Sequence, residues 1–83
     1  VPEMLMLDEP SLGFAPKIVE EMFEIIMRII NSGTSVLLVE ENVNMSLEVS
    51  ERGYVLESGR VVLEDSTEKL ANNPELKRSY LGI

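Results

Sequence analysis

Apolar residues form two short uninterrupted runs along this chain, and a stretch with helical spacing separates them. The runs are Met4-Leu5-Met6-Leu7 and Val36-Leu37-Leu38-Val39, and Ser35 begins the strand that contains the second run. Runs of this kind, without polar alternation, are typical of strands buried on both faces of a parallel sheet. From Lys17 to about Ser32, apolar side chains recur at helical intervals. Strand, helix and strand in this order predict a right-handed βαβ crossover with parallel strands.

The predicted helix from 17 to 32 has one broad apolar face, which we expect to pack on the sheet rather than to form a groove for a partner. Pro16 suits the first turn of this helix, and Gly33 suits the left-handed residue that follows its end. Glu24 and Arg28 lie on the polar face at the favourable i,i+4 spacing. The apolar face consists of Ile18, Val19, Met22, Phe23, Ile25, Ile26, Ile29 and Ile30.

The residues after the second strand predict a short helix, a hairpin and two further short helices. Ser58-Gly59 separates two apolar runs and predicts a two-residue turn. Asp65, followed by Glu68, resembles a capping box at the start of a helix, and Pro74 suits the first turn of the last helix. The expected elements are a helix from Asn42 or Asn44 to about Glu51, strands 53–57 and 60–64, a helix near 67–71 and a helix from 74 onward. The chain as a whole therefore predicts an α/β fold with the element order βαβαββαα.

Length and charge narrow the classes of function. The chain has 83 residues, with 15 acidic and 7 basic side chains and a net charge of −8. Because no basic stripe is present to replace counterions, this balance argues against nucleic acid or an anionic membrane surface as a partner. The chain has no cysteine and no histidine, which excludes disulfides, cysteine–histidine zinc sites and a Ser-His-Asp triad within it. No apolar run approaches the ~20 residues that span a bilayer.

Pairs of carboxylates follow both predicted strands. Asp8 and Glu9 stand before Pro10, which cannot donate to a strand ladder, and Glu40-Glu41 ends the second strand. Ligands of open parallel sheets gather outside the carboxyl ends of the strands, so these acids are expected at one edge. Metal-assisted phosphoryl transfer uses such a pair: one carboxylate holds the metal or its waters, and the other orients an attacking water. The residues alone also suit an ordinary strand exit and acids favoured at the start of a helix.

Several segments resemble ATP-binding-cassette (ABC) ATPases, in the order in which that family has them. Leu5-Met6-Leu7-Asp8-Glu9-Pro10-Ser11 is similar to the Walker B segment and the loop after it. Ser35–Asn42 is similar to the strand and switch loop, and Gly53–Val61 to the next hairpin. Glu9–Pro16 and Arg52–Arg60 resemble the ATPase subunits of branched-chain amino-acid importers. The resemblance covers essentially residues 1–83 and implies the C-terminal portion of a P-loop NTPase sheet, from the Walker B strand to the C-terminal helices.

The resemblance implies that the parent protein hydrolyses MgATP to power an importer, with ATP and Mg²⁺ as cofactors. Asp8 matches the Walker B aspartate, which holds Mg²⁺, and Glu9 matches the catalytic carboxylate that polarises the attacking water. Glu41 matches the switch position near the γ-phosphate, and 10–16 match the loop that crosses to a second ATPase subunit. The implied partners are that subunit and a transmembrane permease. The implied location is peripheral, on the cytoplasmic side of the cell membrane.

Two positions depart from the family's usual pattern. Ala15 stands where most relatives carry an aspartate in the crossing loop, and Glu41 stands where most carry a histidine. A carboxylate at Glu41 repels phosphate unless a proton, Mg²⁺ or water intervenes.

Two segments of the family's site are also missing from the sequence. It contains neither a Gly-x-x-x-x-Gly-Lys-Ser/Thr loop, which binds phosphates, nor a Leu-Ser-Gly-Gly-Gln signature. We therefore expect the chain, which starts on a strand without a methionine, to be a piece of a longer ATPase and to be inactive alone. Its open sheet edges favour self-association. The alternatives are a non-catalytic acidic α/β interaction module, with Asp8 and Glu9 as surface acids, and a different Mg²⁺-dependent phosphoryl-transfer domain.

Overall fold

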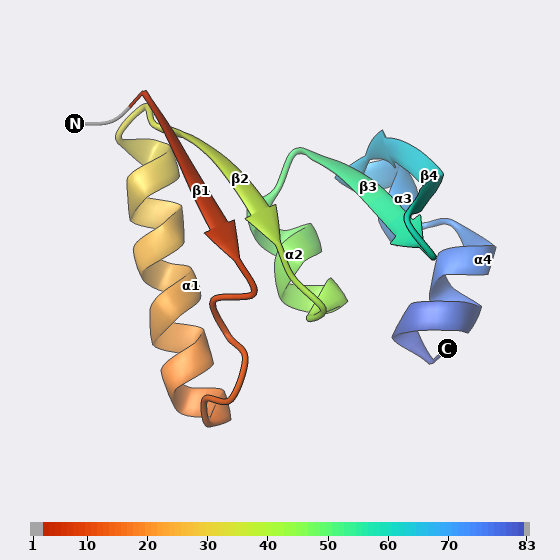
Figure 1. Ribbon diagram of the computed structural model, residues 1–83, viewed down its shortest axis with the longest axis horizontal. Helices are drawn as coiled ribbons and strands as arrows, with labels where there is room; N and C mark the ends of the chain where they lie inside the picture. Colours follow the sequence, from red (N-terminus) through yellow and green to blue (C-terminus); the bar gives the residue numbers. More distant parts are fainter. Residues whose placement is uncertain (1–2, 83) are drawn as a thin grey trace. The chain divides into compact units, whose positions relative to one another are not determined.

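The computed structural model describes residues 3–82 and confirms the α/β fold and the order βαβαββαα (Figure 1). The elements are β1 (Met4–Asp8), α1 (Pro16–Asn31), β2 (Ser35–Val39), α2 (Val43–Val49), β3 (Arg52–Glu57), β4 (Arg60–Ser66), α3 (Thr67–Ala71), α4 (Pro74–Leu76) and a π-helical turn, η1 (Lys77–Leu81), that continues α4. The chain divides into two compact units, Val1–Asn42 and Val43–Ile83, and each has its own two-stranded sheet. None of the helices among residues 3–82 is long and apolar enough to cross a membrane.

The first unit is the predicted βαβ crossover. β1 and β2 pair in parallel, in a register that runs from Met4 opposite Ser35 to Asp8 opposite Val39. α1 connects them, with Pro16 in its first turn, and the chain turns back at Gly33, whose φ of 100° is readily adopted by glycine. The two strands therefore end at the same edge of the sheet.

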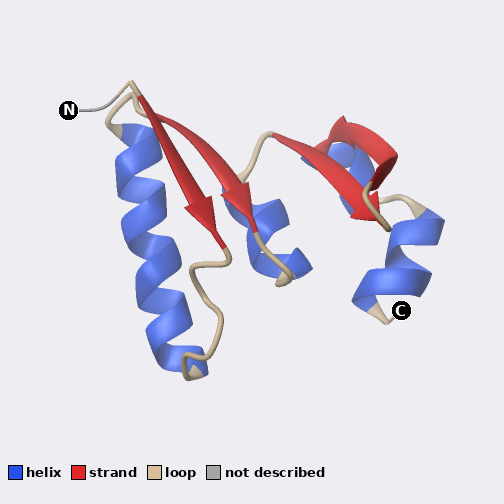
Figure 2. Cartoon of the chain, in the orientation of Figure 1, coloured by secondary structure: helices blue, strands red, loops and turns tan. Residues whose placement is uncertain are grey.

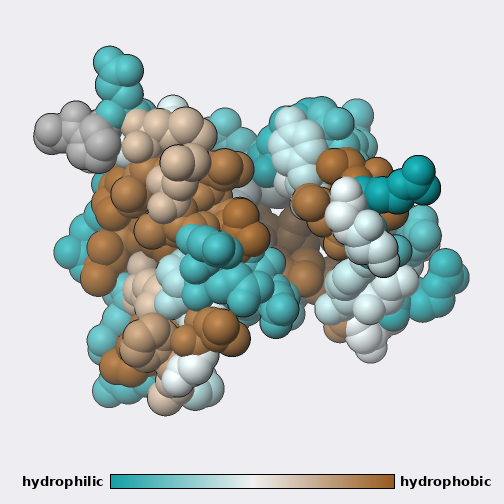
Figure 3. Space-filling view, in the orientation of Figure 1, coloured by the Kyte–Doolittle hydropathy of each residue, from teal (hydrophilic) through white to brown (hydrophobic). Residues whose placement is uncertain are grey.

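The two strands are buried on one face only, so the prediction of burial on both faces is wrong for this chain. Leu5 and Leu38 are half-buried, whereas Met6 is 73% exposed and Leu37 is 47% exposed. In the space-filling view, hydrophobic residues gather at the surface over this unit (Figure 3). The physical reason is that α1 is the one helix described in the unit, and it can cover a single face. The exposed face consists of Met4, Met6, Leu37 and Val39.

The buried face of α1 is narrower than the sequence predicts. Phe23 and Ile26 are the fully buried residues of the helix, at 2% and 3% exposed. Ile18 and Ile25, which we expected on the packed face, are 44% and 52% exposed. A sheet of two strands touches only a narrow stripe of a helix, so the margins of the apolar face remain in solvent.

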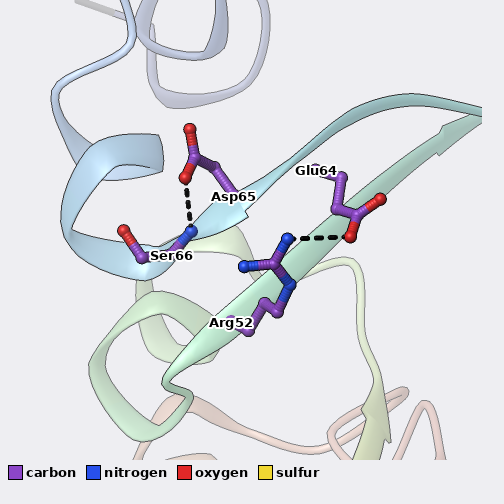
Figure 4. A network of polar contacts seen from close by, with 4 residues as sticks. All are labelled: Arg52, Glu64, Asp65 and Ser66. Carbon is purple, nitrogen blue, oxygen red and sulfur yellow. Dashed lines mark hydrogen bonds and ion pairs between the residues drawn. The ribbon is translucent and has the colours of Figure 1, made fainter.

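The second unit contains the predicted hairpin. β3 and β4 are antiparallel, with an irregular register between Val55 and Leu56. Ser58 and Gly59 form the two-residue turn, both with positive φ (49° and 75°), as turns of this length require. Arg52 and Glu64 make an ion pair of 2.8 Å across the hairpin (Figure 4).

The short C-terminal helices begin on side-chain caps, but the residues differ from the expected capping box. Ser66 caps α3 by accepting a hydrogen bond from the Lys69 N–H at 3.3 Å, while the Asp65 carboxylate accepts one from the Ser66 N–H at 2.8 Å (Figure 4). Asn73 caps α4. The observed N-cap of α3, Ser66, is therefore the residue after the predicted one, Asp65. Both are residue types that cap helices, so the sequence does not distinguish them.

Candidate functional site

The predicted site residues lie where β1 and β2 end. Asp8 is the last residue of β1 and is paired with Val39, the last residue of β2. Glu9 and Glu40 follow these strands directly. Both strands point the same way, and both loops leave from the same edge of the sheet (Figure 2). The parallel pairing therefore brings two pairs of acids to one edge of the sheet. These are Asp8 and Glu9 at the end of β1, and Glu40 and Glu41 at the end of β2.

Glu9 holds an unusual backbone conformation at this rim. Its φ is 46°, in the left-handed region that residues other than glycine seldom adopt. Its N–H donates to the carbonyl oxygen of Val39 at 2.6 Å, and its own carbonyl oxygen accepts from the Leu12 N–H at 3.2 Å. The chain therefore leaves the strand by a sharp turn centred on Glu9. Strained backbone of this kind concentrates at functional sites, where the surrounding structure holds it in place.

The carboxyl group of Glu9 stands among other acids. Its pKa is raised above the ordinary value, first because of desolvation and then because of the negative charges of Glu41, Asp8 and Glu40. A hydrogen bond between the side chains of Glu9 and Glu41 raises the same pKa further. The structure thus brings Glu9 within electrostatic reach of both Asp8 and Glu41. Their catalytic and binding roles stay predictions.

Glu40 differs from the other three acids because backbone and hydroxyl donors surround it. Its Oε1 accepts from the Ser11 hydroxyl at 2.6 Å, from the Glu41 N–H at 3.1 Å and from the Asn42 N–H at 3.4 Å. Its Oε2 accepts from the Ser11 N–H at 3.2 Å. In the sequence Glu40 is one more acid at the strand end, and nothing at that position predicts these bonds. The feature of the sequence that could have indicated them is Ser11, a hydrogen-bond donor in the loop after the neighbouring parallel strand.

The donor set is suited to Mg²⁺ bound in the manner typical of nucleotide sites. Mg²⁺ usually takes one or two carboxylates and completes its coordination with water and substrate phosphates. Asp8 supplies such a carboxylate, and oxygen is the ligand atom that this cation prefers. No group of three or more acidic side chains among residues 3–82 is arranged to hold a metal by itself. Asp8 as a ligand of Mg²⁺ stays a prediction.

The loop between the site and α1 is open to solvent. Leu12 is 69% exposed and Phe14 is 56% exposed. Ala15 takes the first position before α1 and offers no side-chain cap to the helix. An apolar loop presented in this way is consistent with a segment that contacts another surface, which is the role implied for 10–16 by the resemblance.

No protein-family model matches the chain. Its sequence is similar to curated proteins along almost its whole length. It is 48% identical over 81 residues to the high-affinity branched-chain amino acid transport ATP-binding protein BraG of Pseudomonas aeruginosa, covering 98% of this chain and 35% of that protein. It is 39% identical over 82 residues to the corresponding protein LivG of Escherichia coli, covering 98% and 32%. It is 36% identical over 81 residues to the lipopolysaccharide export system ATP-binding protein LptB of Haemophilus influenzae, covering 98% and 34%.

The chain thus spans about a third of the length of these relatives. Its structure is similar to that of MJ1267, an ATP-binding cassette of an ABC transporter, in its ADP conformation. The TM-score is 0.76, the sequences are 23% identical, and the match covers 99% of this chain and 34% of MJ1267. A second structure of MJ1267 gives a TM-score of 0.75 at 22% identity, with coverage of 93% and 32%.

Proposed function

We propose that this chain, whose homologues along its whole length are ABC ATP-binding proteins and whose fold is that of an ABC ATPase, is the C-terminal part of a subunit that hydrolyses MgATP. The observation that carries the proposal is the meeting of Asp8, Glu9 and Glu41 at the carboxyl edge of β1 and β2. In parallel α/β sheets this edge is where ligands bind.

The roles follow from the chemistry of each side chain. Asp8 holds Mg²⁺, directly or through water, and the ion neutralises charge on the phosphates when it is bound. Glu9 accepts a proton from the attacking water and orients it. Its raised pKa strengthens it as a base, because a carboxylate among like charges binds a proton more readily. The bond from its N–H to Val39 keeps the backbone of Glu9 at the strand end.

The remaining parts of the site come from other segments of the parent protein. The chain has no glycine-rich phosphate-binding loop, and its net charge of −8 repels a nucleotide. Hydrolysis needs donors and cations that face the phosphates, and these acids provide none. The isolated chain is therefore catalytically inactive, and MgATP turnover by it would contradict this part of the proposal.

The names of the relatives support a particular class of transported substrate. BraG and LivG are named as branched-chain amino acid transport proteins, and BraG shares more identical residues with this chain than the lipopolysaccharide exporter LptB does (48% against 36%). The parent protein accordingly powers an importer of branched-chain amino acids. Its partners are a second ATPase subunit and transmembrane permease subunits, and it sits peripherally on the cytoplasmic side of the membrane.

The test is Glu9→Gln in the full-length protein. Losing the general base is expected to lower ATP turnover at least about 100-fold, whereas the dissociation constant of ATP stays within roughly threefold because the phosphate-binding parts are intact. Glu20→Gln, an equal change of charge at an exposed position of α1, is the control and leaves turnover unchanged. Hydrolysis that survives Glu9→Gln contradicts the proposal. A full-length protein that does not bind ATP supports the interaction module instead.

A further inference from the structure

The carboxylate of Glu40 is the point at which the loops after β1 and β2 are joined. Among the described residues, four hydrogen bonds reach it from groups in these loops: two from Ser11 and one each from the backbone of Glu41 and Asn42. Ser11 lies 29 residues before Glu40 in the sequence, so these two bonds are tertiary and not local. The side chain is half-buried, which limits competition from water.

These bonds place Glu9 between two attachments to the same strand end. At Glu9 itself, the backbone N–H donates a hydrogen bond to the carbonyl oxygen of Val39 at 2.6 Å. Two residues after it, Ser11 is held by the Glu40 carboxylate through both its N–H and its hydroxyl. Val39 and Glu40 are neighbours in β2 and its loop, so the turn at Glu9 is fixed on both sides by one short segment.

The same carboxylate also orients the backbone of Glu41, the residue that follows it. Oε1 accepts from the N–H of Glu41 at 3.1 Å while it accepts from Ser11. The side chains of Glu9 and Glu41 are in contact with each other. A shift of the Glu40 side chain would therefore displace both members of that pair. An ionised carboxylate suits this place, because it accepts at both oxygens and all four of its partners donate.

We infer that Glu40 is a positioning residue: it clamps Ser11 to the end of β2 and thereby sets where the Glu9 carboxylate stands relative to Glu41. The inference rests on the function proposed above and adds a residue to it. Glu40 acts through Glu9 and needs no contact with nucleotide. Turnover depends on such placement, since displacement of a reacting group by about 1 Å can cost up to about 100-fold in rate.

The experiment uses the full-length protein and separates turnover from nucleotide affinity. Glu40→Ala is expected to lower kcat roughly 10- to 100-fold, with the KM for ATP changed less than about twofold because Glu40 does not bind nucleotide. Ser11→Ala removes one of the same bonds and lowers kcat less, and Ser11→Thr, which keeps the hydroxyl, restores it. Glu20→Ala on the exposed face of α1 is the control.

Two double variants test whether Glu40 acts through these partners. In the Glu40→Ala background, Ser11→Ala is expected to cause no further loss, since the bonds it removes are already absent. In the Glu9→Gln background, Glu40→Ala is likewise expected to add nothing. Losses that multiply in either pair contradict the inference. If Glu40→Ala does not fold, the Ser11→Ala and Ser11→Thr comparison decides it: equal turnover in these two variants overturns the clamp.

The results distinguish the inference from the proposed function. If Glu9→Gln retains hydrolysis, the proposed function is wrong and the clamp falls with it. If Glu9→Gln abolishes hydrolysis while Glu40→Ala and Ser11→Ala keep the kcat of the unmodified protein, only the clamp is wrong.

Discussion

At the scale of single residues, Glu9 combines two unfavourable features. Its backbone is in the left-handed region, and its carboxyl group faces the charges of Glu41, Asp8 and Glu40. Neither feature improves the packing of the fold. Their coincidence in one residue is what a site selected for activity at the expense of stability produces.

Glu9→Gln is therefore expected to stabilise the folded chain at neutral pH. The pKa of Glu9 is raised above its ordinary value of 4.5, so the folded state favours the protonated form. That favourable contribution is present below 4.5 and is lost as pH rises through the raised pKa. At pH 7 the unmodified chain carries a repulsion that glutamine lacks. We expect a higher Tm for the variant at pH 7, by circular dichroism, and a difference that disappears below pH 4.5.

The control for this measurement is Glu20→Gln, which changes the net charge equally but lies on the exposed side of α1. Its Tm should follow that of the unmodified chain across the same pH range. A Glu9→Gln variant that is less stable at pH 7 would show that the carboxylate is held by favourable contacts instead.

Glu41 is the second residue whose charge we expect to limit the proposed activity. The resemblance to ABC ATPases aligns it with a position that most of them give to a histidine, and its side chain contacts Glu9. Glu41→His in the full-length protein removes a negative charge from the place proposed for the γ-phosphate and adds a donor. We expect turnover to rise, on the order of tenfold. Steady-state ATPase assays check this, with Glu41→Gln separating loss of charge from gain of imidazole. Unchanged or lower turnover in Glu41→His would count against it.

At the scale of elements, α1 depends on very few buried side chains. Phe23 and Ile26 are the residues of the helix that are fully buried. Phe14, in the loop before the helix, is 56% exposed. The chain thus offers the same aromatic residue in two environments.

Phe23→Ala is expected to cost about 3–5 kcal/mol of unfolding free energy, because it leaves a cavity between helix and sheet. That is a large part of the ~5–15 kcal/mol that holds a typical domain together. Phe14→Ala should change the same quantity by less than about 0.5 kcal/mol. Urea unfolding followed by circular dichroism compares the two. Equal losses for both variants would show that α1 does not pack as described.

The order of the elements could be predicted because hydrophobic spacing and turn residues are local signals. Gly33 and Ser58-Gly59 mark their turns in the sequence itself. The degree of burial could not be predicted in the same way. Met6 and Leu7 are both apolar, yet only the arrangement of neighbouring elements decides that one is exposed and the other half-buried. An apolar run shows that a strand is able to be buried, but it does not show which neighbouring elements cover the strand.

The candidate site also has a part that could be predicted from the sequence and a part that could not. Asp8, Glu9 and Glu41 follow from strand ends that must share an edge, and the structure places them there. The bonds of Glu40 depend on where a loop 29 residues away presents its donors. Side-chain acceptors of this kind carry no periodicity, so no spacing rule distinguishes Glu40 from Glu41 in the sequence.

At the scale of the whole molecule, charge and apolar surface oppose each other. The net charge is −8, so copies of the chain repel one another. The sheet of β1 and β2 exposes Met4, Met6, Leu37 and Val39, and each of the two strands is paired on one side only within the described residues. Unpaired strand edges beside an apolar face are a common route to self-association.

The isolated chain is therefore expected to self-associate, and to do so more strongly as salt is added. At about 0.1 M salt, the repulsion between charges more than about 10 Å apart is largely screened, whereas apolar contact is unaffected. Sedimentation equilibrium at rising concentration and two salt levels measures this. Leu37→Lys should shift the mean mass toward the monomer, since it places a charge in the middle of the exposed face. Glu20→Gln, which changes the net charge by the same amount away from that face, should increase association slightly. A monomer at every concentration and salt level would show that the exposed face and open edges do not pair, and association that weakens with salt would assign it to charge.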